Sequence, residues 1–561
     1  MRKQWKCYDT NLQQAKKLQS EYKISSLIAT ILANRNIINE EQIRKFIHPT
    51  RNDFYDPFKM PDMEQAVERI LQAIEYNEKI IIYGDYDVDG ITSITVLKRF
   101  LQDREVLVDY YIPNRIDEGY GLNKTAIQKI ASKGYKLIIT VDCGITSKEE
   151  IDLANELGID VVITDHHEVP EELPKAIAVI DAKRKDSKYP FNQLAGVGVS
   201  FKLIQALSQK MQLPEKEYLK YLDIVCVGTI SDIVPLLDEN RVITKLGLKL
   251  VEQTKNMGLK ALLEVADYKK IDSNTISFGI APRINACGRL ADAKIALELF
   301  LTEDFEKAKE IASKLNEYNL QRQEMEKNIY DEAVEELSKK DEEEQIIILG
   351  KEGWHHGVIG IVASKITEKY FKPSILICFE GEEGKGSGRS IPGFNLHEAL
   401  TKNSEYLEKF GGHSMAVGVS IKTKNFEKLK KQLQEYGKSS NICDIIPIIY
   451  IDEETTLKDI NIQAVKQLEL LQPFGEANKE PIFVCRKLKI QSIRTLSEGK
   501  HIKLTLKDDN YFIDVIGFQM GDLIEEYKLG DKVDVVGTLE INEFNGSEKV
   551  QMRLKDIMHT V

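Results

Sequence analysis

Residues 80–90 read IIIYGDYDVDG, an apolar run that ends in three carboxylates on alternate positions. The apolar part, Ile80 to Tyr83, is typical of a strand that is buried on both faces of a parallel sheet. A polar turn that only caps the next helix would need one aspartate, not three. In open parallel sheets, ligands bind beyond the carboxyl ends of the strands. We therefore expect Asp85, Asp87 and Asp89 to belong to a binding site.

Around this stretch, short β-branched runs alternate with amphipathic segments, which predicts βαβ units and an α/β domain with a parallel sheet. The predicted strands are Ile80 to Tyr83, Val106 to Ile112, Leu137 to Val141, Val161 to Thr164 and Ala178 to Ile180. Helices are predicted between them, at Thr92 to Gln102 and Lys148 to Leu157. The second helix stops before Gly158, a common helix terminator.

Two further predicted strands end in polar side chains. Asp142 follows one, and Asp165, His166 and His167 follow the other. A histidine pair alone would suggest a hydrogen-bonded surface turn, but three polar strand ends of one sheet should converge. Carboxylates with one or two imidazoles suit Mn²⁺ or Mg²⁺, and two such ions about 3.5–4 Å apart can activate water for phosphate displacement. The sequence thus predicts a site for two ions.

Bulk composition limits the class of protein. The 561 residues are 42% hydrophobic and 30% charged, which predicts a soluble protein of three or four domains. The net charge of −12 argues against a protein that coats nucleic acid electrostatically, so any DNA contact should be local. Apolar runs stay shorter than the roughly 18 residues of a membrane span, which predicts a cytoplasmic protein without membrane contact.

The cysteines point to no covalent or zinc framework. There are seven of them, an odd number, and none forms a CxxC pair. We therefore expect neither a disulfide network nor a structural zinc site.

A long helix and a second α/β region follow the first. Residues 302–344 contain no Pro or Gly and carry apolar residues at helical spacing, which predicts one connecting helix. A coiled-coil dimer is the alternative, but Arg322 interrupts the stripe, which favours a monomer. Beyond it we predict strands at Ile346 to Leu349 and Ser374 to Phe379, a helix at Val358 to Tyr370, and a Gly-rich turn from Gly381 to Gly388.

From about Asp452 the pattern changes to short alternating strands, which suggests a small barrel of the OB type. The predicted strands are Ile502 to Leu506, Tyr511 to Phe518, Lys532 to Ile541 and Val550 to Lys555. Residues 480–561 contain 12 Lys and Arg against 14 Asp and Glu, so a DNA-binding barrel would rely on base stacking. Candidate aromatic residues are Phe474, Phe483, Tyr511, Phe518 and Phe544.

These patterns divide the chain into five expected parts. They are an N-terminal helical extension over 1–60, a catalytic domain over 61–300, a connecting helix over 301–344, a second α/β domain over 345–440, and the barrel over 452–561.

The order of four motifs resembles the DHH phosphoesterase superfamily, and within it the RecJ family. The motifs are Asp87 with Asp89, Asp142, Asp165-His166-His167, and GTISD at residues 228–232. The resemblance implies an exonuclease that degrades single-stranded DNA from 5′ to 3′ and releases mononucleotides in DNA repair and recombination. It also implies a DHH catalytic domain, a DHHA1 domain and an OB-fold.

The resemblance also implies roles for individual residues. The implied metal ligands are Asp87, Asp89, Asp142, His166 and Asp232. Asp85 and His167 would be catalytic residues, with His167 near the scissile phosphate as an acid or electrostatic stabiliser. Chemistry alone does not choose between Asp223 and Asp232, and the family pattern favours Asp232.

Substrate contacts are expected downstream. APRINACGRL at residues 281–290 resembles a RecJ motif in which Arg283, Asn285 and Arg289 either contact phosphate or tie the helix to the sheet. The stretches GWHHGVIG (residues 353–360), GSGRS (386–390) and FGGH (410–413) resemble the DHHA1 domain. Their glycines would let backbone amides approach a phosphate closely, and the arginine would supply a bidentate fork. The residues expected to bind substrate there are His355, Ser387, Arg389, Gly411, Gly412 and His413. Asp181-Ala182 and His356 depart from the family pattern. None of them is a proposed metal ligand, so the departures bear on the details of substrate recognition and not on the chemistry.

Recognition of a strand end is expected to use three donors. A terminal 5′-phosphate carries more charge than an internal phosphodiester, and guanidinium forks suit it. We expect Arg115 from the catalytic domain to act with Ser387 and Arg389 from the second domain. Surface pairing of Arg115 with Asp117 or Glu118 is the alternative.

Two competing functions share the acidic cluster. DHH enzymes that act on short oligonucleotides or cyclic dinucleotides need no barrel to hold a strand. An inactive replication scaffold would have broken ligand positions, and here all are intact. The expected partners are single-stranded DNA, with a single-strand-binding protein and a helicase as further candidates.

Overall fold

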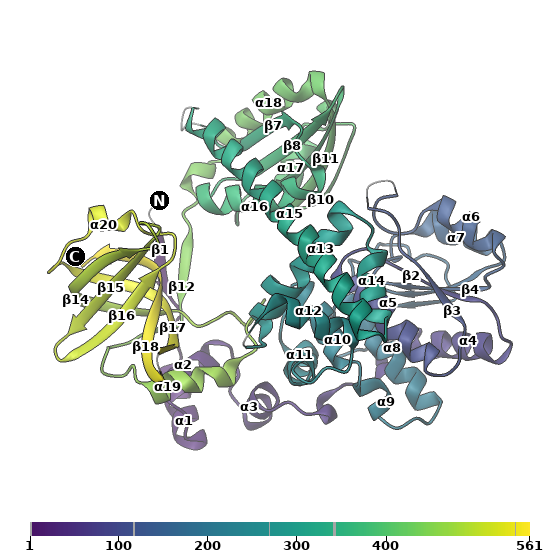
Figure 1. Ribbon diagram of the computed structural model, residues 1–561, viewed down its shortest axis with the longest axis horizontal. Helices are drawn as coiled ribbons and strands as arrows, with labels where there is room; N and C mark the ends of the chain where they lie inside the picture. Colours follow the sequence, from purple (N-terminus) through teal and green to yellow (C-terminus); the bar gives the residue numbers. More distant parts are fainter. Residues whose placement is uncertain (1–2, 116–117, 269, 340–343, 545, 561) are drawn as a thin grey trace. The chain divides into compact units, whose positions relative to one another are not determined.

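The computed structural model describes residues 3–115, 118–268, 270–339, 344–544 and 546–560 (Figure 1). The chain divides into two compact units. The larger unit contains residues 3–263, 267–281 and 448–561, and the smaller unit contains 264–266 and 282–447.

The larger unit contains the predicted parallel sheet. Its strand order is β3-β2-β4-β5-β6, and every neighbouring pair is parallel. The strands are β2 (Ile80–Gly84), β3 (Val108–Tyr111), β4 (Leu137–Val141), β5 (Asp160–Thr164) and β6 (Ala178–Ile180). Because all five run the same way, their carboxyl ends lie at one edge of the sheet. The parallel-sheet fold class is confirmed.

Helices cover both faces of this sheet (Figure 1). Apolar residues of α6 (Lys124–Ser132) and α7 (Lys148–Glu156) share a core with strand residues on one face. On the other, α5 (Val88–Gln102) packs on β2, α8 (Gly196–Lys210) on β4 and β5, and α4 (Met63–Glu75) on β6. The remaining helices of this part are α9 (Lys216–Leu219), α10 (Leu222–Ser231), α11 (Asp238–Val251) and α12 (Met257–Ala266).

Helix α5 starts at Val88, earlier than the predicted start at Thr92. The side chain of Asp87 accepts a hydrogen bond from the amide of Gly90 and caps the helix. The prediction of the helix start was wrong because the acidic motif was treated as a loop. Asp89 consequently lies in the first turn of α5.

The C-terminal part of the larger unit is a closed barrel. Its strand order is β13-β14-β15-β16-β18-β17, and pairing of β14 with β17 closes it. The strands are β13 (Glu453–Glu454), β14 (Phe483–Leu496), β15 (His501–Asp508), β16 (Tyr511–Gly517), β17 (Lys532–Phe544) and β18 (Ser547–His559). Helices α19 (Ile462–Gln467) and α20 (Leu523–Glu526) accompany it. Strand β14 was not among the strands predicted from the sequence.

The N-terminal segment packs on this barrel. Strand β1 (Gln4–Cys7) pairs in parallel with β12 (Ile448–Ile451). Helices α1 (Leu12–Tyr22), α2 (Ser26–Asn34) and α3 (Glu40–Ile47) contribute side chains to one hydrophobic core with the barrel strands. Two ends of the chain thus form one folded body.

The smaller unit contains helices around a mixed five-stranded sheet. The sheet order is β10-β11-β9-β8-β7, and only β7 and β8 pair in parallel. The strands are β7 (Ile347–Glu352), β8 (Ser374–Glu380), β9 (Glu383–Arg389), β10 (Lys409–His413) and β11 (Ala416–Lys422). The helices are α13 (Ala281–Leu290), α14 (Lys294–Leu301), α15 (Phe305–Ser338), α16 (His356–Tyr370), α17 (Leu396–Thr401) and α18 (Phe426–Ser439). Helix α15 confirms the predicted long helix over Phe305–Ser338, and residues 340–343 of the predicted range lie outside the described residues.

The Gly-rich segment 381–388 is not a turn, as the sequence predicted, but mostly the strand β9. Its alternate glycines face neighbouring side chains at close range. A Cβ added at Gly386 would lie 2.6 Å from Val419 and 2.8 Å from Ile377. Glycine is therefore required here by packing within a sheet rather than by a turn conformation.

The described helices include none that combines the length and the apolar character needed to cross a membrane.

Candidate metal centre

The polar strand ends of the larger unit converge as expected. Three groups of side chains each place their donor atoms within 4.8 Å of one another. The groups are Asp85 with Asp87 and Asp142; Asp89 with His166 and Asp232; and Asp142 with His166 and His167. Asp142 and His166 each belong to two of these groups, so the three groups form one continuous cluster. We call these seven residues the carboxylate–imidazole cluster.

Asp89 is held by the start of another helix. It is 2% exposed, and its two carboxylate oxygens accept hydrogen bonds from the amides of Gly196 (2.6 Å) and Val197 (2.8 Å), the first residues of α8. A Cβ at Gly196 would lie 2.7 Å from the Asp142 side chain. The glycine therefore allows α8 to start against two carboxylates of the cluster.

The structure separates Asp232 from Asp223. Asp232 follows the last turn of α10, and its Oδ2 lies 3.7 Å from Nδ1 of His166. Asp223 lies in the first turn of the same helix, about 13 Å away by helix rise, and accepts a 2.6 Å hydrogen bond from Thr254. Of the two aspartates that chemistry alone left open, Asp232 is the one in the cluster.

Asp165 orders the two histidines. Its Oδ1 accepts hydrogen bonds from the amides of His166 (2.7 Å) and His167 (3.2 Å) and lies 2.7 Å from Nδ1 of His167. Nε2 of His166 lies 3.0 Å from Oδ1 of Asp142. The His166 ring consequently faces the carboxylates, while the His167 side chain remains 42% exposed at the rim.

The buried carboxyls of the cluster resist ionisation. Burial, reinforced by neighbouring carboxylates, raises the pKa of Asp89 to about 7 and that of Asp232 to about 9, and it raises the pKa values of Asp85 and Asp142 as well. Burial and the neighbouring His167 lower the pKa of His166 to about 3, so its imidazole is neutral.

These groups fit hard divalent cations. Among the described residues, the buried oxygens Asp85 Oδ1 and Asp232 Oδ2 have no hydrogen-bond partner. Crowded carboxylates with such oxygens, next to a neutral imidazole, form the donor set that Mn²⁺ and Mg²⁺ prefer.

Comparisons with known proteins agree with this geometry. Residues 79–229 match the DHH family N-terminal domain, residues 322–439 the DHHA1 domain, and residues 451–556 the RecJ OB domain. The single-stranded-DNA-specific exonuclease RecJ of Bacillus subtilis is 39% identical over 558 residues, covering 98% of this chain and 70% of that protein. RecJ of Dickeya dadantii is 33% identical, and the match covers 95% of this chain and 96% of that protein.

The chain belongs to the RecJ family.

A solved structure supports the same relationship. The crystal structure of RecJ in complex with Mn²⁺ from Thermus thermophilus has a TM-score of 0.87 and 29% identity. The match covers 100% of this chain and 80% of that one.

Tyr120 is a residue of this RecJ-family site that sequence reasoning missed. Its hydroxyl donates to the backbone carbonyl of Asp142 (3.1 Å), and its ring meets the His167 ring edge-on, with centroids 5.5 Å apart. The hydroxyl oxygen of Tyr120 also lies 3.2 Å from Nδ1 of His167. In the sequence, the one sign that Tyr120 could belong to the site was its place between Gly119 and Gly121, shortly after the candidate residue Arg115.

Arg115 lies near the cluster. Its guanidinium stacks 4.9 Å from the centroid of the Tyr86 ring, and its charge lowers the pKa of Asp85 against the larger raising effect of burial. The alternative partner Asp117 lies outside the described residues. The other, Glu118, accepts hydrogen bonds from Tyr111 and the Asn114 amide.

In the smaller unit, Ser387 and Arg389 lie on the same face of β9. Nη1 of Arg389 donates to Oγ of Ser387 (3.0 Å) and to the Gly388 carbonyl (2.8 Å). A Cβ at Gly360 of α16 would lie 2.9 Å from Oγ of Ser387. Burial alone lowers the pKa of Arg389, and no carboxylate among the described residues forms an ion pair with it. This guanidinium is therefore a candidate anion site.

The remaining expected contacts have structural partners within the smaller unit. Arg283 donates to Asn316 of α15 (3.0 Å), and Arg289 donates to the Gly357 carbonyl (2.7 Å), which favours the helix-tying role for both. Nδ1 of His355 accepts from the amide of Gly357 and caps α16. Asn285 lies on α13, and Gly411, Gly412 and His413 lie on the edge strand β10.

Proposed function

We propose that this RecJ-family chain is an exonuclease that hydrolyses the phosphodiester backbone of single-stranded DNA with Mn²⁺ or Mg²⁺, two ions being expected. The observation that carries the proposal is the carboxylate–imidazole cluster at the carboxyl edge of the parallel sheet. When bound, such ions lower the pKa of a coordinated water and stabilise charge on the phosphate oxygens. The residues that would hold them are the expected ligands Asp87, Asp89, Asp142, His166 and Asp232. Asp85, expected as a catalytic residue, is proposed as a further ligand because its carboxylate is grouped with those of Asp87 and Asp142.

The protein's own groups have separate tasks in this reaction. Asp89 and Asp142 are oriented before any ion binds, by the start of α8 and by His166, so little rearrangement is needed. His167 lies at the rim, and although burial lowers its pKa, the hydrogen bond to Asp165 raises it overall. A protonated His167 can therefore donate a proton to the leaving oxygen or stabilise charge on the phosphate.

We propose 5′ to 3′ digestion with release of mononucleotides. Arg389 with Ser387 offers a half-buried guanidinium and a hydroxyl, which suit a terminal phosphate. Arg115 provides a further cation close to the cluster. Gly411, Gly412 and His413 on β10 are proposed to approach the substrate as well.

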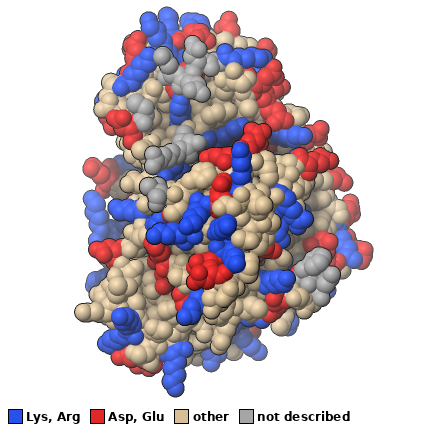
Figure 2. Space-filling model, turned by 90° about the vertical axis from the view of Figure 1, so that its left-hand side faces the viewer, with Lys and Arg blue, Asp and Glu red and all other residues tan. Residues whose placement is uncertain are grey.

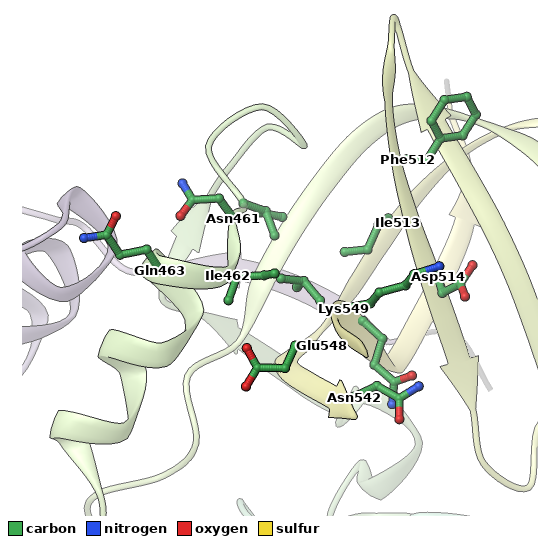
Figure 3. A pocket seen from close by; sticks show the side chains of 12 residues that line it. Asn461, Ile462, Gln463, Phe512, Ile513, Asp514, Asn542, Glu548 and Lys549 are labelled. Atoms are coloured by element: carbon green, nitrogen blue, oxygen red, sulfur yellow. The ribbon is translucent and has the colours of Figure 1, made fainter. Parts of the chain in front are cut away.

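The barrel is proposed to hold the rest of the strand. A groove of about 730 Å³ lies between α19 and the strands β16 to β18, with Phe512, Ile462 and Lys549 on its walls beside Asn461, Gln463 and Asn542 (Figure 3). Asp514 and Glu548 also line it, so stacking and amide hydrogen bonds must outweigh charge. On the face shown in Figure 2, basic and acidic side chains are interspersed.

One of the aromatic residues that the sequence suggested for base stacking, Phe483, was a wrong prediction. Phe483 is fully buried in the barrel core and is not available to bases. Tyr511 (45% exposed) and Phe518 (52%) are available, and Phe512 (59%) joins them although the sequence did not single it out. Phe474 is partly buried, and the side chain of Phe544 lies outside the described residues.

A role in DNA repair and recombination, monomeric action, and cooperation with a single-strand-binding protein or a helicase belong to the same proposal. End-labelled single strands and duplexes should be incubated with Mn²⁺, Mg²⁺ or EDTA. We expect metal-dependent loss of single strands from the 5′ end and intact duplexes. Cleavage of cyclic dinucleotides but not of long single strands would contradict the proposal.

A further inference from the structure

Ile233, the residue directly after Asp232, adopts a backbone conformation that is unfavourable for its β-branched side chain. Its φ angle is 60°, in the left-handed region. A β-branched residue is a genuine outlier there, because its Cβ substituents crowd the backbone. Glycine is the usual residue where a helix ends in this conformation, and Ile233 follows the end of α10. Backbone geometry therefore gives no reason for isoleucine at this position.

Core packing gives no reason either. The residue is 72% exposed, whereas Leu236, three positions later, is 2% exposed. The amide of Leu236 donates a 2.9 Å hydrogen bond to the carbonyl of Glu476, and its side chain packs over Gly475. Leu236 thus anchors this segment, and Ile233 contributes little to the folded core. Strain kept without a packing benefit is characteristic of functional sites.

The position of Ile233 suggests what it contacts. Consecutive Cα atoms are about 3.8 Å apart, so the backbone of Ile233 adjoins that of Asp232, whose carboxylate belongs to the carboxylate–imidazole cluster. Its apolar side chain cannot bind the ions. We propose that Ile233 is a substrate-contacting residue that packs against the deoxyribose or base of the nucleotide whose phosphate enters the cluster. This inference rests on the proposed exonuclease function. An apolar contact of this kind would serve every nucleotide.

Two substitutions test the proposal by separating strain from contact. Ile233→Gly removes both the side chain and the strain, and Ile233→Ala removes the contact while keeping a Cβ. For Ile233→Gly we expect an unchanged or higher melting temperature. For both variants we expect about 10-fold weaker binding of a labelled single strand in EDTA, measured by fluorescence anisotropy, and a similar loss of kcat/KM with Mn²⁺. Mn²⁺ affinity, measured by calorimetric titration, should stay at the wild-type value.

Matched controls address each component separately. Lys23→Gly changes another left-handed residue (φ 53°) at the end of α1 and should leave DNA binding unchanged. Leu107→Ala truncates a side chain that is 90% exposed at the amino edge of the sheet, opposite the cluster. Wild-type DNA affinity in both Ile233 variants would overturn the proposal, and so would a parallel loss of Mn²⁺ affinity. If the wild type binds single strands but cuts none, the exonuclease function fails instead.

Discussion

Nε2 of His166 lies 3.0 Å from Oδ1 of Asp142, although the two residues come from the ends of different strands. This contact joins the three donor groups into one cluster, since each residue belongs to two of them. A change at either position should therefore disturb two of the three donor groups.

The first prediction concerns these two residues. Asp142→Ala and His166→Ala should each reduce hydrolysis at least about 100-fold, because a ligand lost from a two-ion site removes water activation and charge stabilisation. Circular dichroism should show a retained fold. His48→Ala, at an exposed histidine outside the cluster, is the control. Turnover near that of the wild type in either cluster variant would remove that residue from the mechanism.

Metal binding should be coupled to proton release. Without ions, the pKa of Asp89 is about 7 and that of Asp232 about 9, so near neutral pH Asp232 is protonated and Asp89 is partly protonated, and a cation must displace these protons. Apparent Mn²⁺ affinity should thus increase as pH rises from about 6 to 9. Titration calorimetry in buffers of different ionisation enthalpy measures the released protons directly. A pH-independent affinity with no proton release would contradict this prediction.

The same shifts determine how stability depends on pH. Both folded-state pKa values lie above the ordinary value of 3.8, so the unfolded state loses these protons first. Without metal, the stabilising contribution of these groups is fully present below pH 3.8 and is lost as pH rises through about 7 and 9. Melting temperatures in EDTA should accordingly fall over that range, and Mn²⁺ should reverse the fall.

The strand ends were predictable from the sequence because the signal is local. An apolar run followed by carboxylates within a few residues fixes both the strand and the edge of the sheet where Asp85 and Asp142 lie. The shared core of the N-terminal helices and the barrel was not predictable, because residues such as Ile28 and Leu504 are far apart in the chain. Tyr120 escaped for the same reason, since its role depends on contacts with His167 and Asp142 that only the folded chain reveals.

The shared core leads to a prediction about truncation. Removing residues 440–561 alone should expose Ile28, Leu32 and their neighbours, each at a cost of about 1.5–3 kcal/mol, and the protein should aggregate. Removing residues 3–50 together with 440–561 deletes both sides of this core and should restore solubility. Size-exclusion chromatography distinguishes the two truncated proteins. A soluble, monomeric product of the single truncation would show that the N-terminal helices do not need the barrel.

Tyr120 should act as a positioning residue. Tyr120→Phe keeps the ring against His167 but removes the hydrogen bond to the Asp142 carbonyl. We expect a loss in kcat of about 10-fold, with KM and Mn²⁺ affinity unchanged, because the orientation of His167 matters only during the reaction. Tyr76→Phe, at a tyrosine that is 65% exposed after α4, is the matched control. A change confined to KM would instead make Tyr120 a binding residue.

The last prediction concerns the strand end. Arg389 is half-buried, contacts Ser387, and has no ion-pair partner among the described residues, so a phosphate would supply its counter-charge. A terminal 5′-phosphate gains more from this guanidinium than a 5′-hydroxyl does, by about 1.5–3 kcal/mol for a charge-assisted hydrogen bond. Arg389→Ala should therefore lose about 10-fold or more of the preference for phosphorylated strands while it retains Mn²⁺ binding.

The decisive measurement is kcat/KM for 5′-phosphorylated and 5′-hydroxyl strands, converted to a free-energy difference for wild type and variant. Arg115→Ala tests the second guanidinium in the same way. Arg51→Ala, which removes an exposed arginine paired with Glu215, controls for a general loss of positive charge. Because salt screens long-range attraction more than a buried contact, the wild-type preference should persist at about 0.15 M ionic strength. If the preference survives in both Arg115→Ala and Arg389→Ala, the end is recognised elsewhere.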